Sequence, residues 1–507
     1  MRECSVAAVD LGAESGRVMR VSLADGRLHT QEIHRFANTP VRGAGTLCWD
    51  APRLFAEIRQ GLCHAAARGS LSGIGVDTWG VDFALLDEQD HLLENPFHHR
   101  DRRTDGMMEE AFQRMPREEI FERTGIQFLP INTLYQVLSL AIHRPEILQR
   151  ARTFLTMPDL FHFWLTGRKA CEYTNATTTQ LYDARAGGWS QPLLAAIDMT
   201  TALFPEVVAP GTPLGAMLPA IAGEMEGLAG TPVIAPACHD TASAVAGTPL
   251  GSKRSAYISS GTWSLVGVEV PRPLITPQTF AGNFTNEGGV DGTTRLLKNV
   301  MGLWLLQECR RAWTAGGASY SYDDLEQRAG VARPFAAFVH PNAPEFLPPG
   351  DMPGRLRAYG ARTGQRFPED PGAVTRYLLE GLALQYRHTL RELETCLGWQ
   401  VDAIYVVGGG SKNRLLCQMT ANATGLPVVA GPVEATALGN AIVQMKALGT
   451  IASLAEGREI VRKSFPQVAF TPRDCGAWDE AAVRWECFRL PSRPPHSSPP
   501  LTGRRTC

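Results

Sequence analysis

The order strand, glycine turn, strand occurs in both halves of this chain, and it limits the folds that the chain can adopt. The apolar run SVAAVD is followed by LGAESG and RVMRVSL, and near residue 254 the run RSAYISS is followed by a Gly-Thr turn and WSLVGVEV. Further buried strands follow, GIGVD in the first half and AIYVV in the second. The match is one of pattern and not of residue identity. It predicts a duplicated α/β architecture with a cleft between two similar halves.

Two amphipathic stretches predict helices that cover these strands. Leu54, Ile58, Leu62 and Ala66 recur every four residues within APRLFAEIRQGLCHAA, the spacing of one helix face. A longer apolar stripe predicts a second helix, which Gly398 closes as a C-cap. The members of that stripe are Val374, Leu378, Leu382, Tyr386, Leu390, Leu393 and Leu397. Strand AIYVV, turn GGGSKN, helix RLLCQMTANAT, strand VVA and helix ATALGNAIVQMKAL complete the second half.

The composition is that of an ordinary globular protein and excludes several classes. The chain has 507 residues, 44% hydrophobic and 20% charged, with a net charge of −2, so nothing attracts it in bulk to nucleic acid or anionic lipid. Its apolar runs are shorter than the ~18 residues of a membrane span. We therefore expect a cytoplasmic enzyme or binding protein, a monomer or small homo-oligomer, whose partner is a small molecule.

Known metal, disulfide and hydrolase patterns are missing. The 11 cysteines form no C-x-x-C and do not pair with histidines at zinc spacing, so neither a disulfide framework nor a structural metal site is predicted. HExxH, GxSxG and GxxxxGK[ST] are absent.

The first glycine turn has the features of a phosphate-binding turn. Two glycines in DLGAESGR let backbone N–H groups converge on phosphate oxygens, and Arg17 adds positive charge. Asp10 can hold a hydrated Mg²⁺. An ordinary hairpin with a surface arginine is the alternative.

Two turns in the second half could complete a nucleotide site. The hydroxyls and glycine of residues 259–264, SSGTWS, could form a second phosphate clamp, although a plain Ser-rich turn is the alternative. Residues 407–411, VGGGS, run from an apolar strand through three glycines into a helix. Such a turn lets a base or ribose lie against bare backbone and presents a helix N-terminus.

Asp240 places a carboxylate where the apolar run PVIAPAC passes into the small residues TASAVAG. A carboxylate in such a setting costs free energy unless something pairs with it or uses it. In phosphoryl transfer from ATP, one carboxylate accepts the proton of the attacking hydroxyl. The alternative is a helix N-cap, and both roles can hold at once.

Ten runs spread over residues 6–445 resemble the FGGY carbohydrate kinases. They are DLGAESGR, GVDTWGVDF, GIQFLPINTLYQ, TNATTTQLYD, CHDTASAV, SSGTWSL, TNEGG, LKNVMGLWLLQ, GGGSKN and GPVEATALGN. The resemblance implies two ribonuclease H-like domains of the actin-like ATPase type, which close on ATP, Mg²⁺ and a ketose. We expect an N-terminal domain at 1–247, a nucleotide-binding C-terminal domain at 248–490 and, from its Pro/Ser-rich composition, a disordered tail at 491–507.

Carried over position by position, the resemblance also implies the site residues. Those implied to contact ATP are Ala13, Glu14, Ser15, Gly16, Arg17, Thr262, Gln307 and Gly409. Those implied to contact the sugar are Gly80, His239, Asp240, Thr241 and Asn299, with Asp240 as the proton acceptor.

The chain departs from the wider family at two positions. Ala13 stands where many relatives carry a phosphate-binding Thr, and His99 stands where the family has Trp in W-x-D-x-R, which weakens a sugar-binding role for Asp101 and Arg103. Cys238 is interpreted as a packing residue.

Three further features near these motifs are open to more than one interpretation. Of Asp77 and Asp82, we expect Asp77 to face the cleft. Trp79 could pack on the methyl end of a 6-deoxy sugar or belong to the core. TNATTTQ could contact sugar, but its Thr run favours a plain strand.

The runs GVDTWGVDF, TNATTTQL and KNVMGLWLLQ are specific to one reaction within the family. The resemblance in these runs implies transfer of the γ-phosphoryl group of ATP to the O1 hydroxyl of L-rhamnulose, giving L-rhamnulose 1-phosphate and ADP in L-rhamnose catabolism. The first alternative is a kinase of the same family for another ketose or polyol, such as L-fuculose. A non-metabolic actin-like ATPase and a catalytically inactive sugar sensor are the others.

Overall fold

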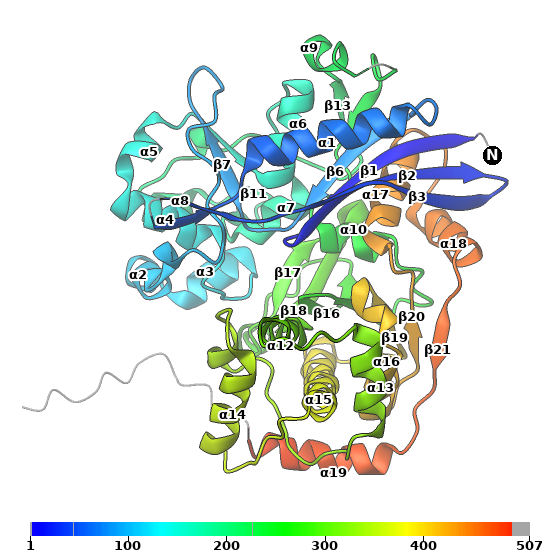
Figure 1. The fold of residues 1–507 in the computed structure, drawn as a ribbon. Coiled ribbons are helices and arrows are strands. Elements are labelled where there is room, and N and C mark those ends of the chain that lie inside the picture. Colours follow the sequence, from blue (N-terminus) through cyan, green and yellow to red (C-terminus); the bar gives the residue numbers. More distant parts are fainter. Residues whose placement is uncertain (1–2, 44, 226, 489–507) are drawn as a thin grey trace, which may run out of the picture.

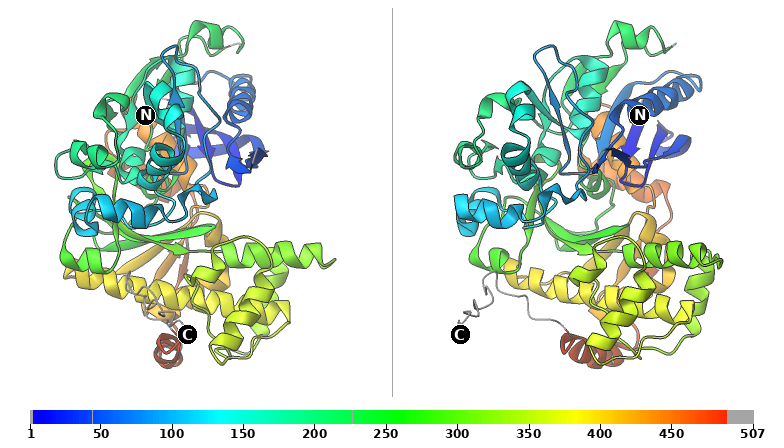
Figure 2. Two further views of the ribbon diagram at one scale, coloured as in Figure 1. Left: turned by 90° about the vertical axis from the view of Figure 1, so that its left-hand side faces the viewer. Right: turned by 60° about the vertical axis from the view of Figure 1, so that its left-hand side comes forward.

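The computed structural model describes residues 3–43, 45–225 and 227–488. The predicted tail at 491–507 lies outside these residues. Figures 1 and 2 show two lobes, each built on a twisted sheet, with the first half of the chain in one lobe and most of the second half in the other.

The N-terminal lobe contains a six-stranded sheet in the order β13-β14-β6-β1-β2-β3. β1, β2 and β3 form an antiparallel meander, β6 and β14 continue it in parallel, and β13 returns antiparallel. Their bounds are β1 Cys4–Leu11, β2 Ser15–Ala24, β3 Arg27–Ala37, β6 Gly73–Thr78, β13 Pro213–Ala216 and β14 Pro232–Ile234.

The C-terminal lobe repeats this order in a seven-stranded sheet, β17-β18-β16-β15-β19-β20-β21. From β18 onward, an antiparallel meander, two parallel strands and a final antiparallel strand follow in the same sequence. The duplicated α/β architecture expected from the sequence is confirmed. The bounds are β15 Ser255–Ser260, β16 Trp263–Val270, β17 Thr285–Gly288, β18 Thr294–Met301, β19 Ala403–Val407, β20 Val428–Ala430 and β21 Val468–Phe470.

Helices cover the sheets because successive residues of a strand point to opposite faces, and in the central strands the residues on both faces are apolar. In the N-terminal lobe, α1 (Ala51–Ala66) packs against β2 and β3, on the face where Ala7 and Val9 of β1 are buried. In the C-terminal lobe, α15 (Pro371–Leu397) and α16 (Arg414–Thr424) pack behind the sheet, and Gly398 ends α15 in a left-handed conformation, as predicted. The other helices of this lobe are α11 Pro277–Ala281, α12 Trp304–Ala315, α13 Tyr322–Val331, α14 Met352–Arg362 and α19 Cys475–Glu486.

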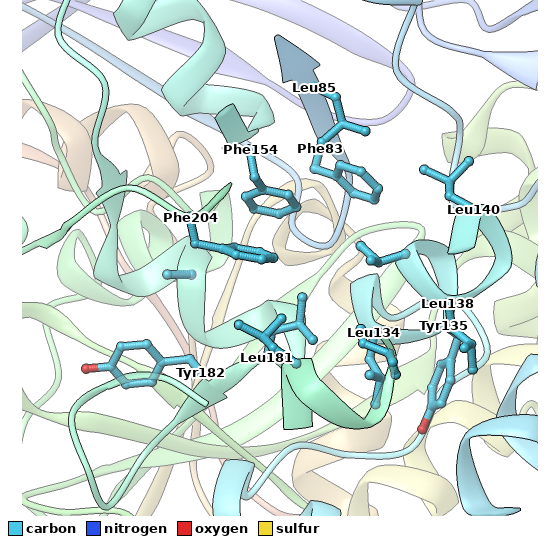
Figure 3. Close-up of a cluster of buried hydrophobic side chains, with 14 of the residues drawn as sticks. Phe83, Leu85, Leu134, Tyr135, Leu138, Leu140, Phe154, Leu181, Tyr182 and Phe204 are labelled. Carbon is cyan, nitrogen blue, oxygen red and sulfur yellow. The ribbon is translucent and has the colours of Figure 1, made fainter. Parts of the chain in front are cut away.

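A largely helical insertion joins β6 to β14 and has its own core. Figure 3 shows aromatic and aliphatic side chains, including Phe83, Phe154 and Phe204, packed between its helices and short strands. The helices there are α2 Met107–Arg114, α3 Arg117–Thr124, α4 Thr133–His143, α5 Pro145–Arg150, α6 Met157–Thr166, α7 Tyr173–Ala176, α8 Gln191–Ala196 and α9 Pro219–Ala222. The short strands are β7 Phe83–Leu86, β8 Thr153–Thr156, β9 Cys171–Glu172, β10 Tyr182–Asp183, β11 Gly188–Trp189 and β12 Val207–Val208, and the hairpin β4 Val41–Gly43 and β5 Thr46–Cys48 precedes the insertion. Single-turn 3₁₀ helices are η1 Arg102–Thr104, η2 Thr177–Thr179, η3 Thr201–Leu203, η4 Val290–Gly292, η5 Pro344–Phe346 and η6 Gly409–Lys412.

Two helices from the second half of the sequence pack on the N-terminal sheet. α17 (Ala435–Ala447) lies against β1 and β6, and α18 (Leu454–Ser464) lies against β3 (Figure 1). α17 also packs closely on α10 (Asp240–Ala246). The domain boundary at residues 247–248 stays a prediction. The N-terminal lobe contains elements from both sides of this boundary, because α17 and α18 follow it in the sequence.

Candidate functional site

A cavity of about 370 Å³ lies between the lobes and is lined from both of them. Most of the predicted site residues surround it: Asp10, Ala13, Glu14, Ser15, Arg17, Gly80, His239, Asp240, Thr241, Thr262, Asn299 and Gly409. Gly16 and Gln307 do not line it. Gly16 is packed against Phe36, whose ring atoms would lie 2.4 Å from an added Cβ, and Gln307 lies behind Thr262, accepting a hydrogen bond from its hydroxyl at 3.2 Å.

Asp240 lies at the start of α10, on the cavity wall. The N-cap residue of this helix is His239, so the alternative interpretation of Asp240 as the N-cap is wrong by one residue. The Asp240 side chain is 29% exposed, with His239 Nε2 at 3.5 Å from Oδ1 and the Thr241 hydroxyl donating to Oδ1 at 3.1 Å. Burial raises the pKa of Asp240 above its ordinary value, and the negative charge of Asp10 raises it further, against the opposing effect of His239. Asp240 is therefore a stronger base than an exposed aspartate.

The first glycine turn brings charged groups to the same cavity. Arg17 Nη2 donates to Asp10 Oδ2 at 2.6 Å, and its Nη1 forms an ion pair with Glu434, just before α17. Burial alone would lower the pKa of Arg17, but the two carboxylates raise it above its ordinary value. On the same turn, Glu14 pairs with Arg311 of α12 at 2.8 Å, so the turn is tied to a helix of the C-terminal lobe.

The expectation that Asp77 faces the cleft is wrong. Asp77 is fully buried at the end of β6 and does not line the cavity. Its Oδ2 accepts from Asn440 of α17, whereas its Oδ1 is buried without a hydrogen-bond partner. Burial, followed by the charge of the neighbouring Asp10, raises the pKa of Asp77 well above its ordinary value.

Asp82 does not line the cavity either, but it holds two side chains that do. Its Oδ2 accepts from Trp79 Nε1 at 2.9 Å, from Trp49 Nε1 at 2.7 Å and from the ring of His99 at 2.9 Å. Burial alone would raise the pKa of Asp82, but His99 and these donors lower it to about 2. Trp79 and His99 are thereby fixed as cavity walls. Asp101 caps η1 and Arg103 bonds Gln136, and neither lines the cavity.

The three glycines after β19 have three different roles. Gly408 has a φ of 78°, and a Cβ on Gly410 would lie 2.0 Å from the hydroxyl of Ser260, so the turn packs directly on the SSGT turn of β15 and β16. Gly409 has no heavy atom within 4 Å of an added Cβ and lines the cavity. A flat group can therefore lie against bare backbone at Gly409.

The TNATTTQ segment is not a strand, contrary to the expectation from its β-branched residues. It forms α7 and η2, because the Glu172 carboxylate caps the N–H groups of Thr174 and Asn175. Thr178 then reaches the cavity, where its side chain lies 3.0 Å from the position of an added Cβ on Gly80.

Several polar cavity residues were not assigned from the sequence. Gln127 Oε1 accepts from the backbone N–H of Asn299 at 2.9 Å and from its side-chain amide at 3.1 Å, which joins the insertion to β18. Asn132 and Glu287 also line the cavity. The signal was present, since these residues are polar positions within GIQFLPINTLYQ and TNEGG, two of the runs that carry the resemblance.

The donor set on one side of the cavity suits a divalent cation. Asp10 and Asp240 both present carboxylates there, and the unpartnered Oδ1 of Asp77 lies behind Asp10 on the neighbouring strand. Hard cations such as Mg²⁺ prefer oxygen ligands of this kind and keep several waters.

Cys238 packs in the core beside the cavity. All cysteines within the described residues are free thiols, and burial raises the pKa of Cys238 well above its ordinary value. Its sulfur lies with Asp159 and His162 in a group whose potential ligand atoms are within 4.8 Å of one another. Asp159 already accepts from Thr156 and from the backbone of Glu172, and His162 Nε2 accepts from Val76 at 3.1 Å. These hydrogen bonds are typical of buried polar side chains with a structural role in the core.

No described helix combines the length and apolarity needed to cross a bilayer.

Comparisons with known proteins point to one protein family over most of the chain. The family model described as the FGGY family of carbohydrate kinases, N-terminal domain, matches residues 5–247, and the corresponding C-terminal domain model matches residues 256–448. A rhamnulokinase from Bacteroides thetaiotaomicron is 43% identical over 95% of this chain and 99% of its own length. One from Oceanobacillus iheyensis is 41% identical over 92% of this chain and 97% of its own.

Solved structures show the same fold at low sequence identity. A gluconate kinase from Lactobacillus acidophilus superposes with a TM-score of 0.78 at 17% identity and covers 96% of each chain. A glycerol kinase from Plasmodium falciparum, solved with ADP, gives 0.78 at 16% identity over 95% of this chain and 97% of that one.

Proposed function

The chain belongs to the FGGY family of carbohydrate kinases, and we propose that it transfers the γ-phosphoryl group of ATP to the O1 hydroxyl of L-rhamnulose, giving L-rhamnulose 1-phosphate and ADP in L-rhamnose catabolism. Support for the sugar comes from the relatives named rhamnulokinase, which align over more than nine-tenths of this chain. The proposed location is the cytoplasm, and a monomer or small homo-oligomer stays a prediction.

The observation that carries the proposal is the position of Asp240. It shares one cavity with the turn at residues 12–15 from its own lobe and with Thr262 and Gly409 from the other. In the proposed reaction, Gly409 contacts the nucleotide and the two turns bind its phosphates. The sugar lies against Gly80, His239, Thr241 and Asn299. Asp240 accepts the hydroxyl proton as the oxygen attacks the γ-phosphorus in line.

Carbohydrate kinases of this family use ATP, typically with a divalent metal, and we propose Mg²⁺ held near Asp10 through water. When bound, the ion neutralises phosphate charge. Arg17 stays near the phosphates while it is paired with Asp10 and Glu434. Closure of the lobes excludes water, which would otherwise take the place of the sugar hydroxyl.

The activity should fall at acidic pH as Asp240 takes up a proton. Because burial raises the pKa of Asp240, the acid limb of kcat/KM against pH is expected above the ordinary range of an aspartate, with the rate falling as pH drops through that pKa. ATP also titrates, so the acid limb is compared with that of Asp10→Asn, in which the metal site changes as well and only the pH position of the limb, not its height, is used. Removal of the neighbouring negative charge lowers the pKa of Asp240 and moves the limb to lower pH. A limb that stays in place in Asp10→Asn contradicts this assignment.

A panel of ketoses tests the substrate. With ADP release measured by a coupled assay, kcat/KM for L-rhamnulose should exceed that for L-fuculose and D-xylulose by about 10-fold or more, the discrimination that one or two substrate contacts provide. A preference for L-fuculose or D-xylulose would contradict L-rhamnulose as the substrate, but it would still agree with a carbohydrate kinase of this family. ATP turnover that no sugar stimulates would favour the actin-like ATPase instead.

A further inference from the structure

A fully buried arginine of the C-terminal lobe contacts His239, the residue before Asp240 in the N-terminal lobe. Arg295, on β18, is 0% exposed. Its Nη2 lies 3.0 Å from His239 Nδ1 and donates to Glu287 Oε2 at 3.1 Å, while its Nε donates to the backbone carbonyl of Gly288 at 2.8 Å. His239 is 8% exposed and Glu287 5%. These three side chains form one buried group, of which His239 and Glu287 line the cavity.

The chemistry of the guanidinium decides where the hydrogen of His239 lies. An arginine in a protein is always protonated and can only donate, so its contact at 3.0 Å needs a lone pair on His239 Nδ1. Glu287 Oε2 lies 3.3 Å from the same nitrogen, farther than the guanidinium, and it already accepts from Arg295 Nη2 at 3.1 Å. The hydrogen of the neutral ring is therefore on Nε2, the nitrogen that lies 3.5 Å from Asp240 Oδ1.

Glu287 supplies the negative charge that this buried group needs. Burial alone would raise the pKa of Glu287, but the charge of Arg295 lowers it below its ordinary value. The ionised Glu287 offsets the buried guanidinium, and Arg295 is left as the group that faces Nδ1.

We propose that Arg295 is a positioning residue that holds His239 as the neutral tautomer with its hydrogen on Nε2. His239 then donates toward Asp240 and the sugar, and it has no free lone pair with which to take up the hydroxyl proton. Asp240 alone is the proton acceptor. The two lobes must meet for this to hold, because Arg295 and Glu287 come from the C-terminal sheet. The catalytic consequence rests on the proposed function, whereas the tautomer does not.

Nitrogen-15 NMR of the full-length protein, labelled at its histidine rings, tests the tautomer directly. The His239 signals are assigned by their loss in His239→Gln. We expect an unprotonated Nδ1 and a protonated Nε2 in the wild-type protein near neutral pH. A protonated Nδ1 overturns the proposal. This result is independent of activity, so it still decides the tautomer if no ketose is phosphorylated and the proposed function fails.

Variants test the consequence for catalysis. Arg295→Met should lower kcat about 10- to 100-fold, the usual loss when a group that orients a functional side chain is removed, and Nδ1 should become protonated toward Glu287. Arg295→Lys, which keeps a donor, should recover most of kcat and keep Nδ1 unprotonated. If Arg295→Met does not fold, Arg295→Met/Glu287→Leu removes both buried charges together and should show the same loss of kcat.

Arg387→Met is the matched control, because Arg387 is a buried arginine of the same lobe that pairs with Asp479 and does not line the cavity. It should keep wild-type kcat. Retention of kcat within threefold in a folded Arg295→Met, or an equal loss in Arg387→Met, overturns the positioning role.

Discussion

Replacement of Asp240 with Asn should lower kcat for ketose phosphorylation by about 10²- to 10⁴-fold, the contribution of a positioned general base. Asn has the shape of Asp and keeps the contact with the Thr241 hydroxyl, but it cannot accept a proton from the attacking oxygen. Sugar affinity, measured by calorimetric titration, should change little, since the other sugar contacts remain. The loss should therefore appear in kcat and not in binding.

A second aspartate provides the control for this measurement. Asp198→Asn changes an exposed carboxylate that pairs with Arg114 in the insertion, away from the cavity. It should leave kcat within twofold of wild type. An Asp240→Asn enzyme with near wild-type kcat would show that the proton acceptor is another residue.

Gly439→Ala should destabilise the protein by about 3 kcal/mol or more, at the upper end of overpacking effects. An added Cβ on Gly439 of α17 would lie 1.7 Å from the backbone carbonyl oxygen of Ser243 on α10, and backbone cannot move aside as a side-chain tip can. The two helices must separate, and α10 begins with Asp240. We expect a lower Tm by calorimetry together with a loss of kcat at temperatures where the variant is folded.

Gly476→Ala is the matched control, because Gly476 lies in α19 with no heavy atom within 4 Å of an added Cβ. Alanine is the better helix former, so this change should be neutral or stabilise by up to about 1 kcal/mol. Equal Tm values for the two variants would contradict the close approach of α10 and α17.

The sequence predicted the elements whose signals are local. The helices at 51–66 and 414–424 and the strands at 263–270 and 403–407 have the bounds that their apolar patterns and flanking turns indicated. These patterns arise from residues a few positions apart, so no knowledge of the tertiary structure is needed to find them. The repeated strand order is a larger-scale form of the same signal.

The errors arose where distant residues decide the outcome. Asp77 was expected at the cleft, but it is covered by Asn440, which lies far along the chain on α17. The Thr-rich run was expected to be extended, but Glu172 caps it and each of three Thr hydroxyls donates to a carbonyl three residues earlier. The contact of Arg295 with His239 also depends on how the lobes meet, and no periodicity in the sequence indicates it.

The placement of α17 and α18 on the N-terminal sheet has a consequence for how the protein is made. The described chain passes between the lobes between 247 and 255, again between 430 and 435, and once more between 464 and 468. A ribosome that has released only residues 1–247 has therefore left Val6 and Ala8 of β1 without part of their cover, because Leu438 and Ala441 of the same core are synthesised later. The first lobe can complete its core only after most of the second has emerged, so the two lobes cannot fold one after the other as independent domains.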